Sequence, residues 1–298
     1  MKYYLPIITC LLFIFCSNID AKKSISTAET KIPSIKKHPK FNEYWYQGKA
    51  EITSYKLTQA RYGELHEGRA VHIFVTEDFL PEKQVKADYH NDKNIPVLKL
   101  NSTKKFVTGI YPYAIMTSTF SPIDLNQQAI KISFSSQEWC GNTFFQLNNR
   151  ANFEVDFHSY FESNADRKQP LKKNILENEL WNQLRISPES LPVGNLNIIP
   201  SFEFLALNNQ QIKAYKAKAS LVKKGGFVKY AIEYPELKRT LTIEATKDFP
   251  YTIESWEETI TKRGKTLTTK AEKIKTIQSA YWQKNGVANV KERKELGL

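Results

Sequence analysis

The sequence predicts a mainly β protein: one large antiparallel meander that forms a curved open barrel or a layered sheet, with one amphipathic helix. Three observations predict this. After residue 44, apolar and polar side chains alternate with a period of two, as in strands with one buried face. Glycine-containing turns separate several of these runs. One stretch, about 174–185, has helical spacing instead. Strands around a single helix favour one layered fold, with two domains that meet near residue 190 as the alternative.

The alternation is clearest in four segments. They are residues 130–135, 153–158, 228–233 and 240–245. In each segment every second side chain is apolar, so one face of the strand is predicted to be buried. The strings Lys224-Gly225-Gly226 and Arg263-Gly264 are predicted to be tight turns, because glycine adopts the positive φ that such turns require.

The helix is predicted from apolar residues that share one face at a spacing of three or four. They are Leu176, Leu180, Trp181 and Leu184. Asn174, followed three residues later by Glu177, indicates the start of this helix. Pro188 and Pro192 are predicted to end it, because proline cannot continue a helix.

The first 21 residues predict a secretory signal. Met1-Lys2 is cationic, and the apolar stretch that follows is shorter than the ~20 residues of a transmembrane helix. Residues 22–43 are then expected to be a disordered basic leader, 44–282 a single mainly β domain and 283–298 a C-terminal tail. The expected location is the periplasm or cell envelope. The alternative is a lipid anchor at Cys16, which the bulky Phe15 before it disfavours.

The basic residues are scattered, so we favour the interpretation that the net charge of +12 serves only solubility, and we expect no nucleic-acid partner. The alternative is an anionic partner such as a membrane surface. Two of the three cysteines lie in the predicted signal, which leaves Cys140 without a disulfide partner. We find no phosphate loop, nucleophile elbow or zinc-protease motif, so we expect no cofactor and no metal site.

Cys140 is a candidate nucleophile, with His158 as its base. A hairpin of residues 130–147 and 152–161 would place Cys140 on the core side and His158 on the other. In this register Phe144 faces Val155. Only a bulge at the neighbouring glycine would bring the pair together, so we expect Cys140 to be structural and the catalytic role to be the alternative.

The face of this hairpin opposite to Cys140 is the candidate ligand-binding surface. With the helix it would present Gln137, Trp139, His158, Tyr160 and Trp181. Aromatic rings beside polar groups suit an amphipathic ligand, such as a lipid. The alternative is that the same residues form an inner lining that packs against the helix.

Several strings in the first half of the chain resemble one family. They are residues 61–64, 74–79, 108–113, 135–141 and 159–162. Together they resemble an uncharacterised family of exported or lipid-anchored proteins of Bacteroidetes-type bacteria. The resemblance covers most of residues 44–282 and implies no activity. Some members carry the label septum formation inhibitor Maf, but authentic Maf proteins are cytoplasmic α/β pyrophosphatases with a Ser-x-Arg-Arg motif, and this chain has no Arg-Arg pair.

Residues 246–250, followed by a strand with Trp256 and a glycine turn, are weakly similar to periplasmic open barrels of the lipoprotein-carrier type. That similarity implies an apolar hollow closed by a helix. The hypothesis from the sequence is therefore a non-enzymatic exported envelope protein that binds an apolar or amphipathic ligand on its concave face. The alternatives are a cysteine-dependent hydrolase or transferase using Cys140 and His158, and an envelope scaffold protein.

Overall fold

A single sixteen-stranded sheet dominates the computed structural model, which describes Met1 and residues 37–298. The first strand, β1 (Ala50–Arg61), lies in the middle of the sheet and pairs with both β2 (Glu64–Leu80) and β16 (Lys265–Ser279). The strands follow in chain order from β2 to one edge and in reverse order from β16 to the other. The predicted fold class, a large antiparallel meander in an open curved sheet with few helices, is confirmed.

The two halves of the sheet differ in sequence but follow the same up-and-down path. The remaining strands of the first half are β3 (Val85–Lys86), β4 (Ile95–Thr108), β5 (Tyr111–Pro122), β6 (Lys131–Glu138), β7 (Gly141–Asn149), β8 (Phe153–Ser159) and β9 (Arg167–Leu171). Those of the second half are β10 (Ile175–Leu176), β11 (Gly194–Ile199), β12 (Tyr215–Lys224), β13 (Phe227–Tyr234), β14 (Arg239–Thr246) and β15 (Ile253–Lys262). Among the strands of residues 37–298, only β10 and β11 pair in parallel.

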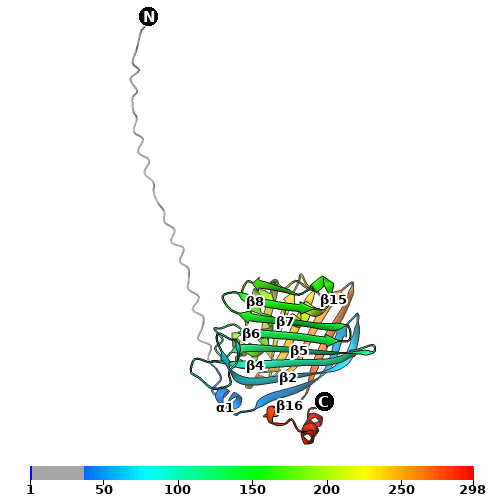
Figure 1. Cartoon of the computed structure of the whole chain (residues 1–298). Coiled ribbons are helices and arrows are strands. Elements are labelled where there is room, and N and C mark those ends of the chain that lie inside the picture. Colours follow the sequence, from blue (N-terminus) through cyan, green and yellow to red (C-terminus); the bar gives the residue numbers. More distant parts are fainter. Residues whose placement is uncertain (2–36) are drawn as a thin grey trace. The chain divides into compact units, whose positions relative to one another are not determined.

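The sheet curves back on itself but does not close. Its edge strands β9 and β10 are consecutive in the chain, with only residues 172–174 between them, yet they do not pair with each other. In Figure 1 the green strands β5 to β8 lie in front of the yellow and orange strands of the second half. Two helices, α2 (Glu177–Ile186) and α3 (Phe202–Leu207), fill much of the space that the sheet encloses. The ring of Phe145 on β7, for example, stacks on Phe202 of α3 at 5.3 Å.

The helix α2 is predicted by the sequence, but its start is three residues later than expected. Ile175 and Leu176 are extended because they pair with β11, so the helix begins at Glu177 rather than Asn174. The carboxylate of Glu179 accepts a hydrogen bond from the Leu176 N–H at 3.1 Å and takes the place of the expected cap.

Short helices that the sequence analysis missed occur at both ends of the described chain. Helix α1 (Phe41–Trp45) buries Phe41 and Trp45, which lie four residues apart and therefore on the same face. The leader predicted to be disordered up to residue 43 is thus wrong for residues 41–43. The predicted signal, Cys16 and leader residues 22–36 lie outside the described residues. Near the C-terminus, α4 (Lys291–Glu295) leads to Leu296, which is buried against Ala50 on the outer face of the sheet.

The register expected for residues 130–161 is wrong. Residues 131–149 form two strands, because Trp139 and Cys140 make a two-residue turn between β6 and β7. Leu147 rather than Phe144 therefore faces Val155. This shift of three positions turns β7 over, so Phe145 lies on the buried face and Phe144 on the outer one. Cys140 is exposed at the turn, not on the core side.

The predicted glycine turns are confirmed. Gly225-Gly226 and Arg263-Gly264 each join two strands, and all four residues have positive φ, as a type I′ hairpin turn requires. A different kind of glycine lies inside β2, where Gly68 packs directly against the neighbouring strand β4. A Cβ added there would lie 2.4 Å from the Lys105 carbonyl oxygen. No helix among residues 37–298 has the length and hydropathy needed to cross a bilayer.

Candidate functional site

A cavity of about 720 Å³ lies at one end of the concave face, between helix α3 and the surrounding strands. Its walls come from β1, β5 to β8, β15 and β16, and α3 forms its floor. Tyr62 and Phe161 line the cavity and are also exposed, so it opens to solvent between the turns that carry them. Helix α3 is held by the Ser201 hydroxyl, which caps it by accepting from the Phe204 N–H at 3.3 Å.

The wall of the cavity is amphipathic. Its main apolar side chains are Tyr113, Phe157, Phe204, Leu207, Ile260 and Leu267. Polar side chains share the wall, among them Gln59, Ser136 and Thr143. The buried Oε1 of Gln59 has no hydrogen-bond partner among the described residues, and a polar group of an amphipathic occupant could supply one, whereas a purely apolar occupant could not.

Arg61 brings a positive charge to the wall. Its Nη1 donates to the Leu207 carbonyl oxygen at the end of α3, and its guanidinium lies over the Tyr62 ring at 4.4 Å. Nη2 lies 3.4 Å from the hydroxyl of Tyr113, which is itself 2.7 Å from the hydroxyl of Tyr62. Within residues 37–298 Arg61 forms no ion pair with a carboxylate. Arg61 is therefore a cation of the cavity wall without a carboxylate partner among the described residues.

The floor of the cavity is held by ion pairs. The Lys104 ammonium donates to Glu203 on α3 at 2.6 Å. Arg239 donates to Glu258 at 2.6 Å and to both carboxylate oxygens of Glu177 at 2.5 and 2.7 Å. Burial acts to raise the pKa of Glu177, but the charge and hydrogen bonds of Arg239 outweigh it and hold this pKa below its usual value. The Lys104 pair holds α3, the Arg239 pairs join β14 to α2 and β15, and the carboxylates of Glu203, Glu177 and Glu258 are neutralised.

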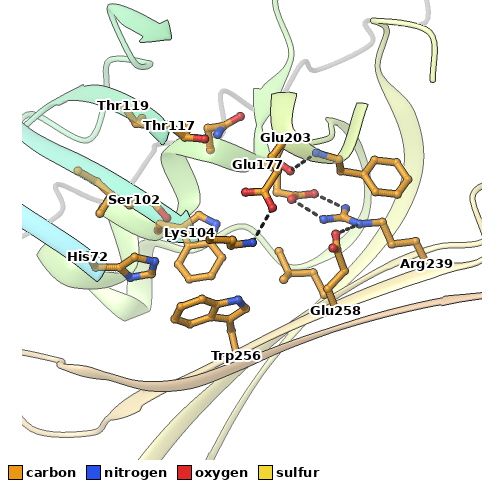
Figure 2. Close-up of a pocket in the computed structure, with 16 residues that line it drawn as sticks. His72, Ser102, Lys104, Thr117, Thr119, Glu177, Glu203, Arg239, Trp256 and Glu258 are labelled. Atoms are coloured by element: carbon orange, nitrogen blue, oxygen red, sulfur yellow. Dashed lines mark hydrogen bonds and ion pairs between the residues drawn. The ribbon is translucent and has the colours of Figure 1, made fainter. Parts of the chain in front are cut away.

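A second, smaller cavity of about 60 Å³ lies behind this floor and shares Glu203 and Glu258 with the large one. Figure 2 shows it, with His72 and Trp256 on one side and the linked charges of Lys104, Glu203, Arg239 and Glu258 on the other. His72 stacks on Trp256 with ring centroids 4.6 Å apart. Burial, with a contribution from the charge of Lys104, lowers the pKa of His72 to about 3, so its ring is neutral near neutral pH.

The structure does not bring the five predicted ligand-binding residues together. Gln137 and His158 lie on the outer face of the sheet, where a His158 ring nitrogen is 3.3 Å from Asp166. Trp181 lies inside and borders the small cavity. Trp139 and Tyr160 are exposed at the open end of the large cavity, where the Tyr160 ring packs on Gly141.

Cys140 and His158 are not joined in a catalytic pair. Cys140 is exposed, and its backbone N–H donates to the Glu138 carboxylate at 2.7 Å. A hydrogen bond to Glu138, with its negative charge, raises the pKa of the Cys140 thiol. A raised pKa lowers the fraction of thiolate, which is the nucleophilic form. Gly141 does not form the bulge that would have brought the two residues together; it is the first residue of β7.

The residues that build the cavity were largely missed by the sequence analysis. Arg61 is named there only within the family-like string 61–64, and no helix is predicted for residues 202–207. A local signal for α3 exists, because Ser201 followed by Glu203 and an apolar run is typical of a helix start. No local signal marks Lys104 or Arg239, whose charges lie on strands and are paired with residues distant in the sequence.

Comparisons with known proteins do not assign the chain to a family. No protein-family model matches the chain, and no curated protein matches it significantly. One solved structure of similar architecture is a β-barrel-like protein of the domain of unknown function DUF1849 from Brucella abortus. Its TM-score is 0.47 at 8% sequence identity, over 77% of this chain and 98% of that chain. A similarity of this size carries no inference about function. The comparisons support neither the resemblance to the exported Bacteroidetes-type family nor the Maf label.

Proposed function

We propose that this protein is a non-enzymatic binding protein that holds an amphipathic ligand with an acidic head group in the large cavity. The observation that carries the proposal is the volume of about 720 Å³ left open beside the packed core. Protein interiors are close-packed, so a space of this size needs an explanation. It falls within the ~300–1,000 Å³ that is usual for small-molecule sites.

The lining supports an amphipathic ligand rather than a purely apolar one. Phe157, Phe204 and Leu267 offer apolar contact, while Gln59 and Arg61 offer hydrogen bonds on the same wall. Burying an apolar chain against such a wall stabilises a complex by ~25 cal/mol per Å² of area removed from water. The polar groups then set the orientation of the ligand.

The charges support an acidic head group. Glu203 and Glu258 are already paired with Lys104 and Arg239, so they do not call for a cationic ligand. Arg61 has no carboxylate partner among the described residues, and a ligand carboxylate or phosphate would supply one. Because Arg61 is held by Leu207 and the tyrosine rings, it would lose little conformational freedom on binding.

The proposal includes export to the cell envelope, on the strength of the signal pattern in residues 1–21. A signal-peptide cleavage assay would test it. Cell fractionation that finds the protein in the cytoplasm would count against this location while leaving the binding proposal in place.

Titration of the delipidated protein with fluorescently labelled hexadecanoic acid tests the binding proposal. Ala206→Trp, which places a large ring in the cavity, is expected to weaken binding at least tenfold. Ala231→Trp adds the same ring to β13, away from both cavities, and is the matched control that should bind normally. The corresponding fatty alcohol should bind more weakly than the acid because it lacks the charge.

Two results would contradict the proposal. One is a delipidated protein that ignores both probes, which would leave the envelope scaffold role as the better hypothesis. The other is an Ala206→Trp variant that binds as tightly as the Ala231→Trp control, because the ligand would then lie somewhere other than the large cavity.

A further inference from the structure

The open end of the cavity is surrounded by hairpin tips. In an antiparallel meander every second turn falls at the same end of the sheet. The turns that follow β1, β4, β6, β8 and β15 therefore share one end, and residues from most of them line the cavity mouth. The hairpin of β4 and β5 projects beyond its neighbours in Figure 1.

Large apolar side chains occupy the tips of these turns and point into solvent. Their exposed fractions are 82% for Ile110, 72% for Tyr160, 69% for Trp139, 61% for Tyr62 and 43% for Phe161. We call this set the apolar rim. Two-residue turns are commonly polar, yet Ile110 and Trp139 lie in such turns and are mostly exposed. The rim therefore points to a partner outside the chain.

A cationic hairpin stands beside the apolar rim. Lys262, Arg263 and Lys265 form the turn between β15 and β16 and line the same cavity mouth. Lys265 donates to the carbonyl oxygen of Gly63, and within residues 37–298 none of the three forms an ion pair. The carboxylate of Glu138, next to Trp139 of the rim, accepts a hydrogen bond from the Cys140 N–H.

We propose that the apolar rim and this cationic hairpin dock the protein on an anionic lipid bilayer, with the cavity mouth facing the membrane. Tryptophan and tyrosine have rings that partition into the membrane interface, where apolar and polar environments meet. Lysine and arginine beside them are attracted to acidic head groups. Rim side chains on separate turns, with polar backbone between them, suit insertion among head groups better than burial in one flat protein interface.

The docking inference goes beyond the proposed function and does not depend on it. A rim that binds membranes would do so whether or not the cavity holds a ligand. If both hold, an amphipathic ligand could pass between the bilayer and the cavity without crossing bulk water.

Cys140 provides a local reporter, because it is exposed and adjacent to Trp139. The full chain, with Cys10 and Cys16 replaced by serine, is labelled at Cys140 with an environment-sensitive fluorophore. It is then mixed with vesicles of phosphatidylcholine, with or without phosphatidylglycerol. A matched control carries Cys140→Ser and Val222→Cys, which moves the label to the exposed end of β12, at the opposite end of the sheet.

On the vesicles with phosphatidylglycerol, the label at position 140 is expected to shift to shorter wavelength and to be quenched by nitroxide on the lipid chains. The label at position 222 should show neither change. Equal responses at both positions, or none at position 140, would overturn the proposal, even if the N-terminal segment held the protein on the vesicles.

Variants separate the two parts of the surface. Ile110→Ser combined with Trp139→Ser should weaken partition to the vesicles at least fivefold, whereas Tyr89→Ser, an exposed ring on another loop, should not. Lys262→Glu with Arg263→Glu should abolish the tighter binding to vesicles that contain phosphatidylglycerol. Each positive charge removed is expected to lower the partition coefficient on these vesicles about fivefold. The control for charge is Lys216→Glu with Lys218→Glu on the outer face of β12. If the rim and control variants lose equal amounts of vesicle binding, the vesicles attract the protein without a particular docking surface, and the proposal is refuted.

Discussion

Replacing His72 with phenylalanine and Glu179 with glutamine, in separate variants, is expected to give the protein opposite responses to acid. Both groups are buried, with exposed fractions of 2% and 3%. Burial lowers the pKa of His72 to about 3 from its usual 6.5. Burial raises the pKa of Glu179 to about 7 from its usual 4.5, although the N–H groups of Ala129 and Leu176 donate to it and act in the other direction.

The signs follow from which state binds the proton. As the pH falls from 6.5 to 4.5, the unfolded chain protonates His72 and the folded chain does not, so the free energy of unfolding falls. Over the same interval the folded chain keeps the proton on Glu179 while the unfolded chain largely lacks it, so this contribution to stability grows as the pH falls. The full effect is about 1.36 kcal/mol per pH unit, but in the unfolded chain His72 is only half-titrated at pH 6.5 and Glu179 at pH 4.5, so each group contributes about 2 kcal/mol across this window. The two contributions cancel in the native protein.

Urea unfolding followed by circular dichroism at several pH values from 4.5 to 6.5 measures the effect. Relative to the native protein, His72→Phe should gain about 2 kcal/mol of stability on acidification, and Glu179→Gln should lose about as much. A constant loss in Glu179→Gln from one unsatisfied N–H does not matter, because only the slope with pH is compared. If the free energy of unfolding of both variants changes with pH as it does in the native protein, the two groups titrate in the folded chain as they do in water, and the reasoning is refuted.

Three further predictions concern single sites. Cys140 should react with iodoacetamide without denaturant, since it is exposed; reaction only after unfolding would contradict the turn at this position. Gly68→Ala should lower the free energy of unfolding by about 1–3 kcal/mol in urea titration, because the new Cβ meets the Lys105 carbonyl; an unchanged midpoint would mean that the strands can move apart. Arg239→Met should cost about 3–5 kcal/mol by leaving Glu177 buried and unpaired, and Glu177→Gln in the same chain should restore part of the loss; no restoration would mean that packing, not charge, is responsible.

Much of the sheet could be predicted because its signals are local. The alternation in residues 228–233 and 240–245 places Tyr230, Ile232 and Leu241 on the buried face, as observed. The glycine turns could be found for the same reason, since a positive φ leaves a mark in the sequence. The turn at Trp139-Cys140 leaves no such mark, because neither residue has a positive φ. The expected continuous strand therefore hid a hairpin.

The candidate site could not be predicted in the same way. Its floor depends on pairs such as Glu177 with Arg239 and Lys104 with Glu203, whose partners come from different elements. On a strand, Lys104 looks like any solvent-facing charge until the sheet curves and brings α3 above it. A cavity is what side chains leave unfilled, so it is visible only once all its walls are placed. The aromatic tips were noticed as Trp139 and Tyr160, but their common position around an opening was not.

The pairing of β1 with β16 has a consequence for the order of folding. The contact between Ala50 and Ser279 joins nearly the whole length of the chain, so the centre of the sheet is among the last parts that can assemble. Until β16 has been synthesised, one side of β1 presents unpaired backbone groups, which invite association with other chains. Truncation at the C-terminus would therefore damage the molecule at its middle rather than at its margin.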